Sequence, residues 1–339
     1  MSVAIISFTE DGRRISERIA AGMPDCTRFS FHKHSDENAE AFDDLSSLTA
    51  EIFSKFDALV FVSSVGIAVR AVAPHLVSKT TDPAVVAVDD CGKFAVSVLS
   101  GHIGGANEFA ERIAGMIRAV PVITTATDSH GLFSPDVFAK KNGLVITDMG
   151  AAKAVAAALV NSEKVGFKCS YPHSEMPDEL TDSGSGKNGI CISENANDKP
   201  FDTTLNLLPR NLIVGIGCKK MTPFTTIKSH ITSVFSENEL DIRRLACVAT
   251  IDIKAEETGL IGFCEKFGLP LKTYTADELM SAQGDFTHSD FVEKTTGADN
   301  VCERAAVCAG GKLIIRKSAE NGITAAVAEL PVYIDFEKE

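Results

Sequence analysis

A glycine-rich segment, Ser100–Asn107, holds the residue types and spacing best suited to chemistry in this sequence. Glycines at Gly101, Gly104 and Gly105 let a backbone approach a ligand closely and leave N–H groups exposed. The start of the helix expected after this segment favours a bound anion, and His102 is the natural proton carrier. The pattern predicts an anion-binding loop with a general base. A tight structural turn around a hydrogen-bonded histidine is the competing interpretation.

Two more segments of the first half follow predicted strands and carry polar groups. Arg70 ends the segment Val65–Arg70 and could clamp a carboxylate through two parallel hydrogen bonds. A solvated arginine on a helix fits this segment equally well. Thr124–Asp128 is rich in hydroxyl groups, and its alternative is an aspartate that caps the next turn. Both segments are candidates for binding an anionic substrate.

Two segments of the second half also carry charged groups near strand ends. Gly215–Lys220 resembles the turn of a dinucleotide-binding fold, but Lys220 stands where the third glycine belongs. Its two glycines and two lysines fit an anion loop. Asp252 and Lys254 alternate along the end of a predicted strand and would share one face. They form either an acid–base pair or a surface ion pair, which is the commoner case.

Signatures of bound metals and nucleotides are missing from the sequence. The loop glycines match neither the Rossmann GxGxxG spacing nor the P-loop pattern. The nine cysteines include no CxxC pair, which argues against zinc and indicates reduced thiols. His32 and His34 could ligate a metal, although two solvated loop histidines are the simpler interpretation. These observations predict an enzyme that needs no added cofactor.

Alternating strands and helices must position these loops, and they predict mostly parallel sheets with added antiparallel hairpins. Hairpin turns are expected at Asp89–Gly92 and at Asn321-Gly322. Predicted strands cover residues 3–8, 27–31, 58–62, 84–88, 94–99, 122–125, 144–147, 212–216, 246–251, 271–274, 312–316 and 323–329. Predicted helices cover residues 10–21, 41–55, 65–73, 106–118, 135–141, 151–160, 222–235, 258–267 and 301–309.

The fold class that follows is α/β. We expect a Rossmann-like, mostly parallel sheet in the N-terminal lobe, a small middle region, and a separate C-terminal α/β domain with a terminal hairpin. The expected domains are residues 1–145 with the glycine-rich loop, residues 146–210 as middle region and linker, and residues 211–339. The polar, aperiodic stretch Tyr171–Asp202 marks the linker.

The expected sheets also predict where a ligand binds, because ligands of parallel sheets lie beyond the carboxyl ends of the strands. The loops concerned follow Val62, Leu99, Thr125, Ile216 and Ile251.

The overall charge limits the classes of partner. A formal net charge of −13 repels nucleic acid and anionic membranes. No apolar run approaches the ~20 residues that span a bilayer, and no basic leader precedes the apolar run Val3–Ile6. The sequence therefore predicts a cytoplasmic protein that binds neither nucleic acid nor membrane. An anionic substrate would need local arginines, lysines or helix N-termini to reverse this field.

Taken together, the segments closely resemble the cobalt-precorrin-5A hydrolase family of anaerobic cobalamin (vitamin B12) biosynthesis. The matches follow the family's order and cover about residues 60–142 and 212–329, whereas residues 1–55 and 145–210 match weakly. Met221 stands where family members often have glycine. The matching segments are Val65–Arg70, Asp82–Val86, Leu99–Asn107, Thr124–Asp128, Gly215–Cys218, Thr250–Lys254 and Asp299–Arg304.

The resemblance implies a specific reaction. The family opens a δ-lactone on the ring-contracted cobalt macrocycle, expels the former bridging carbon with its methyl group as acetaldehyde, and gives cobalt-precorrin-5B. The chain would then be a hydrolase acting on a carbon–carbon bond. The cobalt arrives inside the tetrapyrrole substrate, so neither a protein metal site nor a cofactor is required. Other enzymes of the pathway are further candidate partners, and the sequence leaves the oligomeric state open.

The candidate site residues divide by role, because lactone opening needs a base for water and donors for the oxyanion, while the substrate carries many carboxylates. The catalytic candidates are His102, Asp252 and Lys254. The candidates for substrate binding are Arg70, Lys79, Ser100, Gly101, Gly104, Gly105, Asn107, Thr125, Asp128, Gly215, Gly217, Lys219, Asn300 and Glu303.

Two other classes of function compete with this hypothesis. A non-catalytic protein that binds a tetrapyrrole intermediate would need the same anion loops but no base, so loss of His102 would leave turnover of the pathway intact. A nucleotide-dependent oxidoreductase would need the glycine that Lys220 replaces. Binding of NAD(P) to the purified protein would support that second alternative.

Overall fold

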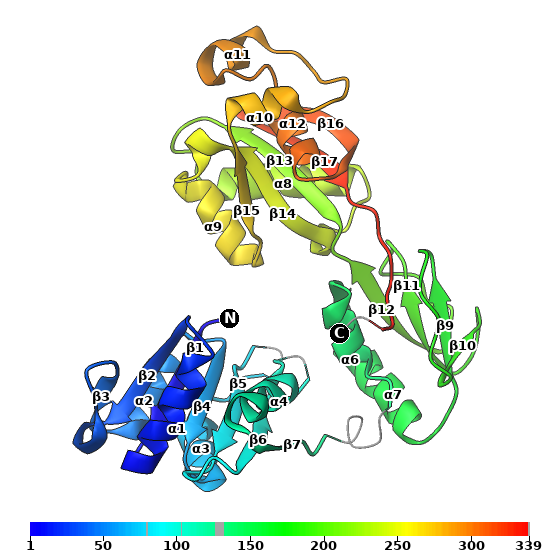
Figure 1. Ribbon diagram of the computed structural model, residues 1–339. Coiled ribbons are helices and arrows are strands. Elements are labelled where there is room, and N and C mark those ends of the chain that lie inside the picture. The colour runs from blue at the N-terminus through cyan, green and yellow to red at the C-terminus, as the bar shows by residue number, and fades with distance from the viewer. Residues whose placement is uncertain (79–80, 103, 126–131, 338–339) are drawn as a thin grey trace. The chain divides into compact units, whose positions relative to one another are not determined.

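The computed structural model describes residues 1–78, 81–102, 104–125 and 132–337, which Figure 1 shows as ribbons. The chain divides into two compact units, Met1–Val137 and Phe138–Glu339. The division into domains at residues 145 and 210 stays a prediction. Lys79 and Asp128, both candidates for substrate binding, lie outside the described residues.

The first unit is built on a seven-stranded sheet with the order β3-β2-β1-β4-β5-β6-β7. The first five strands along the chain are mutually parallel, β6 is antiparallel to β5, and β7 is parallel to β6. The strands are β1 (Val3–Ser7), β2 (Cys26–Phe31), β3 (Glu40–Phe42), β4 (Ala58–Val62), β5 (Ala84–Val88), β6 (Phe94–Leu99) and β7 (Val120–Val122). The α-helices are α1 (Glu10–Ala21), α2 (Leu45–Ile52), α3 (Val65–Val72) and α4 (Ala106–Ile117).

The predicted hairpin between β5 and β6 is confirmed, and it corrects the expected position of the glycine-rich loop. The Asp89 carboxylate accepts backbone N–H groups across the turn, including that of Phe94 at 2.6 Å, and Gly92 has φ +63°. Because β6 runs back along β5, the loop after Leu99 lies at the amino ends of β1, β4 and β5. The parallel-sheet rule had predicted that this loop shares an edge with the loop after Val62, but the two loops lie at opposite edges of the sheet.

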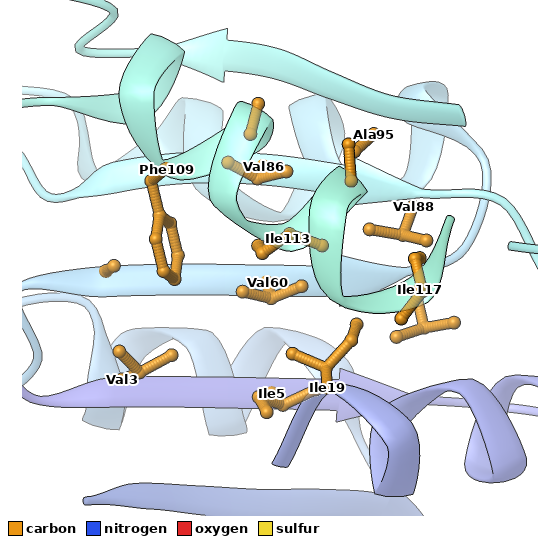
Figure 2. Close-up of a cluster of buried hydrophobic side chains, with 14 of the residues drawn as sticks. Val3, Ile5, Ile19, Val60, Val86, Val88, Ala95, Phe109, Ile113 and Ile117 are labelled. Atoms are coloured by element: carbon orange, nitrogen blue, oxygen red, sulfur yellow. The ribbon is translucent and has the colours of Figure 1, made fainter. Parts of the chain in front are cut away.

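Apolar side chains cover both faces of this sheet. Helices α1 and α4 lie on one face, where Ile19 and Ile113 are fully buried against the central strands (Figure 2). Helices α2 and α3 cover the other face with residues such as Ile52 and Val72. Burial on both faces explains the continuous apolar runs of β4 and β5.

Two predicted elements of the first unit were wrong in their bounds. The helix expected over residues 41–55 is the strand Glu40–Phe42 followed by α2, because the Asp44 carboxylate accepts the Ser47 N–H at 2.7 Å and begins the helix there. The strand expected at residues 122–125 is Val120–Val122, and it pairs with β6 through three residues.

The second unit contains a five-stranded sheet with the order β10-β9-β11-β12-β8, in which only β8 is antiparallel to its neighbour. Helix α7 (Met149–Val160) packs on it. The short helix α6 (Pro135–Lys141) precedes this sheet along the chain, and the boundary between the two units falls within α6, after Val137. The strands are β8 (Leu144–Ile146), β9 (Val165–Cys169), β10 (Leu180–Asp182), β11 (Asn188–Ile192) and β12 (Thr203–Pro209).

The stretch Tyr171–Asp202, expected to be the tail of the middle region and a linker, contributes β10 and β11 to this sheet. Two glycines of the sheet, Gly166 in β9 and Gly189 in β11, lie against one aromatic ring. A Cβ atom at Gly166 or Gly189 would lie 2.2 or 2.3 Å from the ring of Phe201, which is buried. The missing side chains therefore make room for an aromatic ring instead of marking a turn.

The other sheet of the second unit has the order β15-β14-β13-β17-β16, with the first three strands parallel and the last two antiparallel. Helices α8 and α9 pack on one face and α12 on the other. The strands are β13 (Leu212–Cys218), β14 (Leu245–Ile251), β15 (Leu271–Tyr274), β16 (Lys312–Glu320) and β17 (Ile323–Glu329). The α-helices are α8 (Phe224–Glu237), α9 (Thr258–Phe267), α10 (Ala276–Ser281), α11 (Asp290–Thr296) and α12 (Cys302–Cys308).

Two predictions in this part have different outcomes. The hairpin at Asn321-Gly322 is confirmed, with φ +51° and +79° at the two residues. The helix expected from residue 222 begins only at Phe224, because Pro223 occupies the cap position and the Thr222 hydroxyl donates to the carbonyl of Lys219 at 2.8 Å.

The segment after β17 returns to the sheet formed by β8–β12, which we call the middle sheet. The ring of Phe336 stacks on Phe138 with centroids 4.8 Å apart and meets Phe167 edge-on at 5.3 Å. The Asn142 side chain donates to the carbonyl of Asp335 and accepts its N–H, at 2.9 and 2.8 Å. Within the described part of the chain, no helix is long and apolar enough to cross a membrane.

Candidate active site

The loop after β6 is held by hydrogen bonds at both ends. Ser100 has φ +58°, and its hydroxyl donates to the carbonyl of Asp82 at 3.0 Å. The carbonyls of Ser100 and Gly101 accept the N–H groups of Ala106 and Asn107, which begin α4. The Asp82 carboxylate in turn accepts the backbone N–H of Val77 at 3.1 Å. These contacts fix the loop to the segment before β5.

The three glycines of this loop are explained by contacts within it. A Cβ atom at Gly101 would lie 2.7 Å from Oδ1 of Asn107, and one at Gly104 would lie 2.3 Å from Cβ of Ser100. Gly105 has φ +83° at the start of α4, which a residue with a side chain rarely adopts. The close approach occurs inside the loop, and the substrate-binding role of these glycines stays a prediction.

Asn107 links this loop to the end of the next strand. Its side chain is buried, its Oδ1 accepts the Ser97 hydroxyl at 2.7 Å, and its Nδ2 donates to Oγ1 of Thr125 at 2.8 Å. Asn107 and Thr125, predicted separately as candidates, are therefore brought together. The contact is possible because β6 and β7 are parallel and end at the same edge.

His102 lies beside a carboxylate that the sequence did not single out. Its Nδ1 is 3.3 Å from Oδ2 of Asp136, and the two side chains are 18% and 16% exposed. The other oxygen of Asp136 accepts the Ser134 hydroxyl at 2.7 Å. Asp136 lies in the first turn of α6, which begins at Pro135, so an acidic residue near a helix start was its only visible signal in the sequence. The histidine partner lies far away along the chain.

The electrostatics of this pair favour an ionised carboxylate. Burial raises the pKa of Asp136, but hydrogen bonds from His102 and Ser134 lower it by more than burial raises it. The resulting pKa is about 2. An ionised carboxylate can only accept hydrogen bonds. The arrangement therefore suits acid–base chemistry at the imidazole.

The remaining candidate among the described residues of the first unit is Arg70, on α3. Arg70 is exposed there, on the same helix as the exposed apolar side chains of Val65, Ile67 and Val69. An exposed arginine beside apolar surface suits a flat, carboxylate-bearing ligand. Its role in binding stays a prediction.

The glycines of Gly215–Lys220 serve packing in the second unit. Gly215 lies inside β13, and a Cβ atom there would be 1.8 Å from the carbonyl oxygen of Cys302 on α12. A Cβ atom at Gly217 would be 2.6 Å from Oγ1 of Thr324. The likeness to a dinucleotide turn therefore has a different cause, which is a helix packed tightly on a strand. Lys219 follows β13, and its N–H donates to the carbonyl of Gly322 at 3.2 Å.

The predicted pairing of Asp252 with Lys254 is wrong, because β14 ends at Ile251 and the two residues form a 3₁₀ turn. Lys254 instead pairs with Glu257, with Nζ 3.0 Å from Oε2 and the side chains 11% and 8% exposed. The exposed Asp252 side chain accepts the N–H of Ile253 at 2.7 Å. The sequence missed Glu257, whose one-turn spacing from Lys254 was the available signal.

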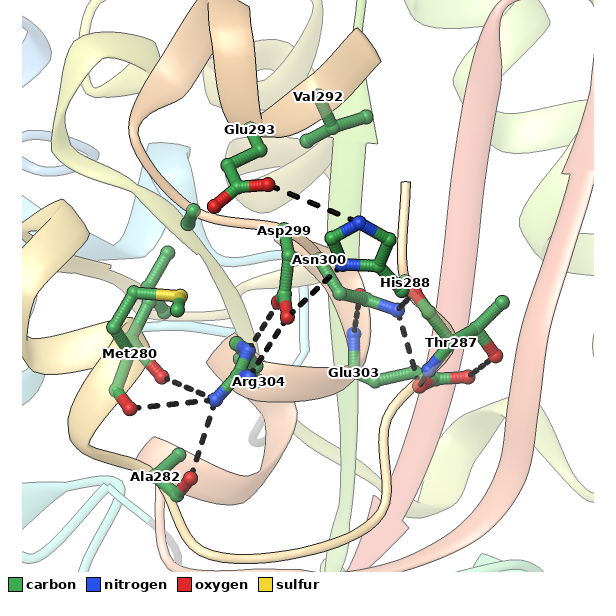
Figure 3. Close-up of polar contacts among 12 residues, drawn as sticks. Met280, Ala282, Thr287, His288, Val292, Glu293, Asp299, Asn300, Glu303 and Arg304 are labelled. Atoms are coloured by element: carbon green, nitrogen blue, oxygen red, sulfur yellow. Dashed lines mark hydrogen bonds and ion pairs between the residues drawn. The ribbon is translucent and has the colours of Figure 1, made fainter. Parts of the chain in front are cut away.

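Asn300 and Glu303, both predicted to bind substrate, belong to a buried network at the start of α12 (Figure 3). The Glu303 carboxylate accepts from the N–H and hydroxyl of Thr287, from Nδ2 of Asn300 and from the N–H of Lys317, at 2.7–3.0 Å. Oδ1 of Asn300 accepts the N–H of Glu303 in the first turn of α12, which begins at Cys302. This network fastens the loop before α11 to α12 and β16.

Groups able to ligate a metal form one cluster among the described residues. His288, Asp290 and Glu293 are all exposed, with Nε2 of the histidine 2.8 Å from Oδ1 of the aspartate. His32, considered earlier as a metal ligand, instead lies 2.7 Å from a carboxylate oxygen of Asp43, and both are exposed.

The fold and this site define an α/β protein whose first unit pairs a histidine and a carboxylate beside a glycine-rich loop, an arrangement suited to acid–base catalysis. Comparison with known proteins identifies the family. Models described as cobalamin synthesis G N-terminal, cobalamin biosynthesis central region and cobalamin synthesis G C-terminus match residues 47–128, 133–209 and 212–328.

Relatives match over nearly the whole chain. The cobalt-precorrin-5A hydrolase of Salmonella typhimurium is 33% identical, covering 95% of this chain and 96% of its own, and that of Priestia megaterium is 30% identical, covering 97% and 95%. The crystal structure of a cobalamin biosynthesis protein G homolog from Sulfolobus solfataricus is 23% identical over 97% of each chain, with a TM-score of 0.42. The chain belongs to the cobalt-precorrin-5A hydrolase family.

Proposed function

We propose that this protein hydrolyses cobalt-precorrin-5A to cobalt-precorrin-5B and acetaldehyde in anaerobic cobalamin biosynthesis. The observation that carries the proposal is the similarity, over at least 95% of the chain, to two relatives that bear the name cobalt-precorrin-5A hydrolase. The pairing of His102 with Asp136 supports it, because hydrolysis needs a base for water.

The proposed reaction has two stages. Water adds to the lactone carbonyl and the ring C–O bond breaks, which leaves a carboxylic acid and a free hydroxyl on the former bridging carbon. That hydroxyl then loses its proton, a carbon–carbon bond breaks, and acetaldehyde departs. The electron pair of the broken bond stays on the macrocycle, which takes up a proton. We assign to His102 the removal of a proton from water in the first stage.

Binding of the substrate is proposed to use cations and apolar surface. Arg70 is exposed beside Val65 and Val69, and Lys219 follows β13 in the second unit. Each is a cation of the kind that binds a carboxylate at the edge of a macrocycle. We propose no added cofactor, because the cobalt belongs to the substrate.

The cytoplasm is the proposed site of the reaction, with other enzymes of the pathway as partners in transfer of the substrate. All nine cysteines lie in the described residues and are free thiols, which suits a reducing compartment.

The direct test is anaerobic incubation of the full chain with cobalt-precorrin-5A, with acetaldehyde as the measured product. We expect one acetaldehyde for each macrocycle converted, after dialysis and without added nucleotide or metal. Binding of the macrocycle without acetaldehyde would point to a non-catalytic binding protein. Activity restored only by a nucleotide or a metal would contradict the proposal of no cofactor.

A further inference from the structure

The carboxylate of Asp136 is held from more than one side. Its Oδ2 is 3.3 Å from Nδ1 of His102, and its Oδ1 accepts the Ser134 hydroxyl at 2.7 Å and the Val137 N–H at 3.1 Å. The backbone of His102 is also fixed, because its carbonyl accepts the Gly105 N–H at 2.9 Å. Each member of the pair is therefore held in place by hydrogen bonds from its own neighbours in the chain.

This geometry determines which ring nitrogen carries the proton. A carboxylate that is ionised can only accept, so Nδ1 of His102 must be the donor in the contact. The pKa of Asp136, about 2, is consistent with ionisation throughout the neutral range. In a neutral imidazole with its proton on Nδ1, the lone pair is on Nε2.

We propose that Asp136 is a positioning residue that fixes His102 as the Nδ1–H tautomer, so that Nε2 takes the proton of the attacking water. The inference rests on the proposed hydrolysis. The water proton moves to Nε2 while the water oxygen bonds to the lactone carbonyl carbon. When the ring C–O bond breaks, the proton on Nε2 passes to the departing alkoxide. Asp136 stays ionised and stabilises the imidazolium formed between these steps.

The first test compares kinetics of full-length variants. Asp136→Asn should lower kcat by roughly 10- to 10³-fold and leave KM within about threefold, since only the base is misaligned. Adding Asp136→Asn to His102→Ala should cause almost no further loss, because Asp136 acts through the histidine. Losses that multiply in the double variant would overturn the inference.

The second test needs no substrate. In protein labelled with ¹⁵N-histidine, two-bond correlations to the ring nitrogens report the tautomer of each neutral ring. His102 should be Nδ1–H in the wild type, and the Nε2–H form should grow in Asp136→Asn. An unchanged tautomer would contradict the proposal. If the wild type releases no acetaldehyde, the proposed function fails, yet this measurement still decides the positioning role.

Two further variants separate positioning from folding. Ser134→Ala removes one donor to Asp136 without removing the carboxylate, and it should lower kcat a few-fold and shift the tautomer partly. It also replaces Asp136→Asn if that variant does not fold. Asp148→Asn is the matched control, because Asp148 also begins a helix, where it accepts the Gly150 N–H at 2.7 Å. We expect wild-type kcat and tautomer from it, and any loss of kcat equal to that of Asp136→Asn would overturn the inference.

Discussion

The glycine-rich segments of the two units resemble each other in the sequence and differ in what they do. In the first unit, Gly101 and Gly104 follow the strand and let a loop close on itself beside His102. In the second unit, Gly215 lies within the strand, where its missing side chain admits α12.

The two polar pairs differ as well. His102 with Asp136 contains an imidazole, which can accept and donate a proton, whereas Lys254 with Glu257 is an oppositely charged pair with little exposure. The difference teaches that glycine content alone does not locate chemistry.

The largest expected effect on this comparison comes from substituting residues of each polar pair in turn. His102→Ala should lower kcat for acetaldehyde release by about 10²–10⁴-fold, the usual effect of losing a general base, with KM within a few-fold. The double variant Lys254→Met with Glu257→Leu removes the other pair together, so no buried charge is left alone. It should keep kcat within about threefold of the wild type.

The contrary result is equally clear. If His102→Ala turns over at the wild-type rate while the double variant is inactive and still folded, the chemistry belongs to the second unit. Kinetics should be measured well below the unfolding temperature of each variant, which circular dichroism establishes.

A smaller effect is expected when the packing role of a glycine is tested. Gly215→Ala places a methyl group against the Cys302 carbonyl and should destabilise the fold by about 1–3 kcal/mol or more. Gly66→Ala is the control, because a Cβ atom there meets nothing within 4 Å, and its effect should stay below about 1 kcal/mol. Urea unfolding measures both. Equal stability of Gly215→Ala and the wild type would remove the contrast between the two glycine-rich segments.

The smallest expected effect concerns acid. The pKa of Asp136 is lowered from 3.8 to about 2, so its ionised form stabilises the folded state by at most about 2 kcal/mol. A lowered pKa contributes stability above pH 3.8 that is lost as the pH falls toward 2. The difference in unfolding free energy between wild type and Asp136→Asn should therefore shrink as the pH falls below about 4. A difference that grows over the same range would refute the lowered pKa.

The sequence predicted much of the fold because long apolar runs and their turns are local signals. The strands at Ala58–Val62 and Ala84–Val88 and the hairpin at Asn321-Gly322 were found in this way. Strand direction was harder, since the reversal at Gly92 moves the loop after Leu99 to the opposite edge. The parallel-sheet rule therefore placed this loop at the wrong edge of the sheet.

The candidate site was predicted only in part, because its partners are distant in the sequence. His102, Asn107 and Thr125 were singled out by type and place, and the structure joins the last two directly. Asp136 carried only the signal of a helix start, and nothing in the sequence connects it with His102. Glu303 was found through resemblance, but its hydrogen bonds serve the packing of α12.

The return of the segment Ile334–Phe336 to the middle sheet has a consequence for the order in which the protein matures. Phe138 and Phe167 emerge from the ribosome long before Phe336, the ring that packs against both of them. During synthesis, those aromatic surfaces stay uncovered while the whole sheet containing β13–β17 is still being made. The sheet β8–β12 therefore completes its packing only after residues 210–336 have been made. Until then its uncovered aromatic side chains are exposed to chaperones. A truncation after β17 would make that transient state permanent.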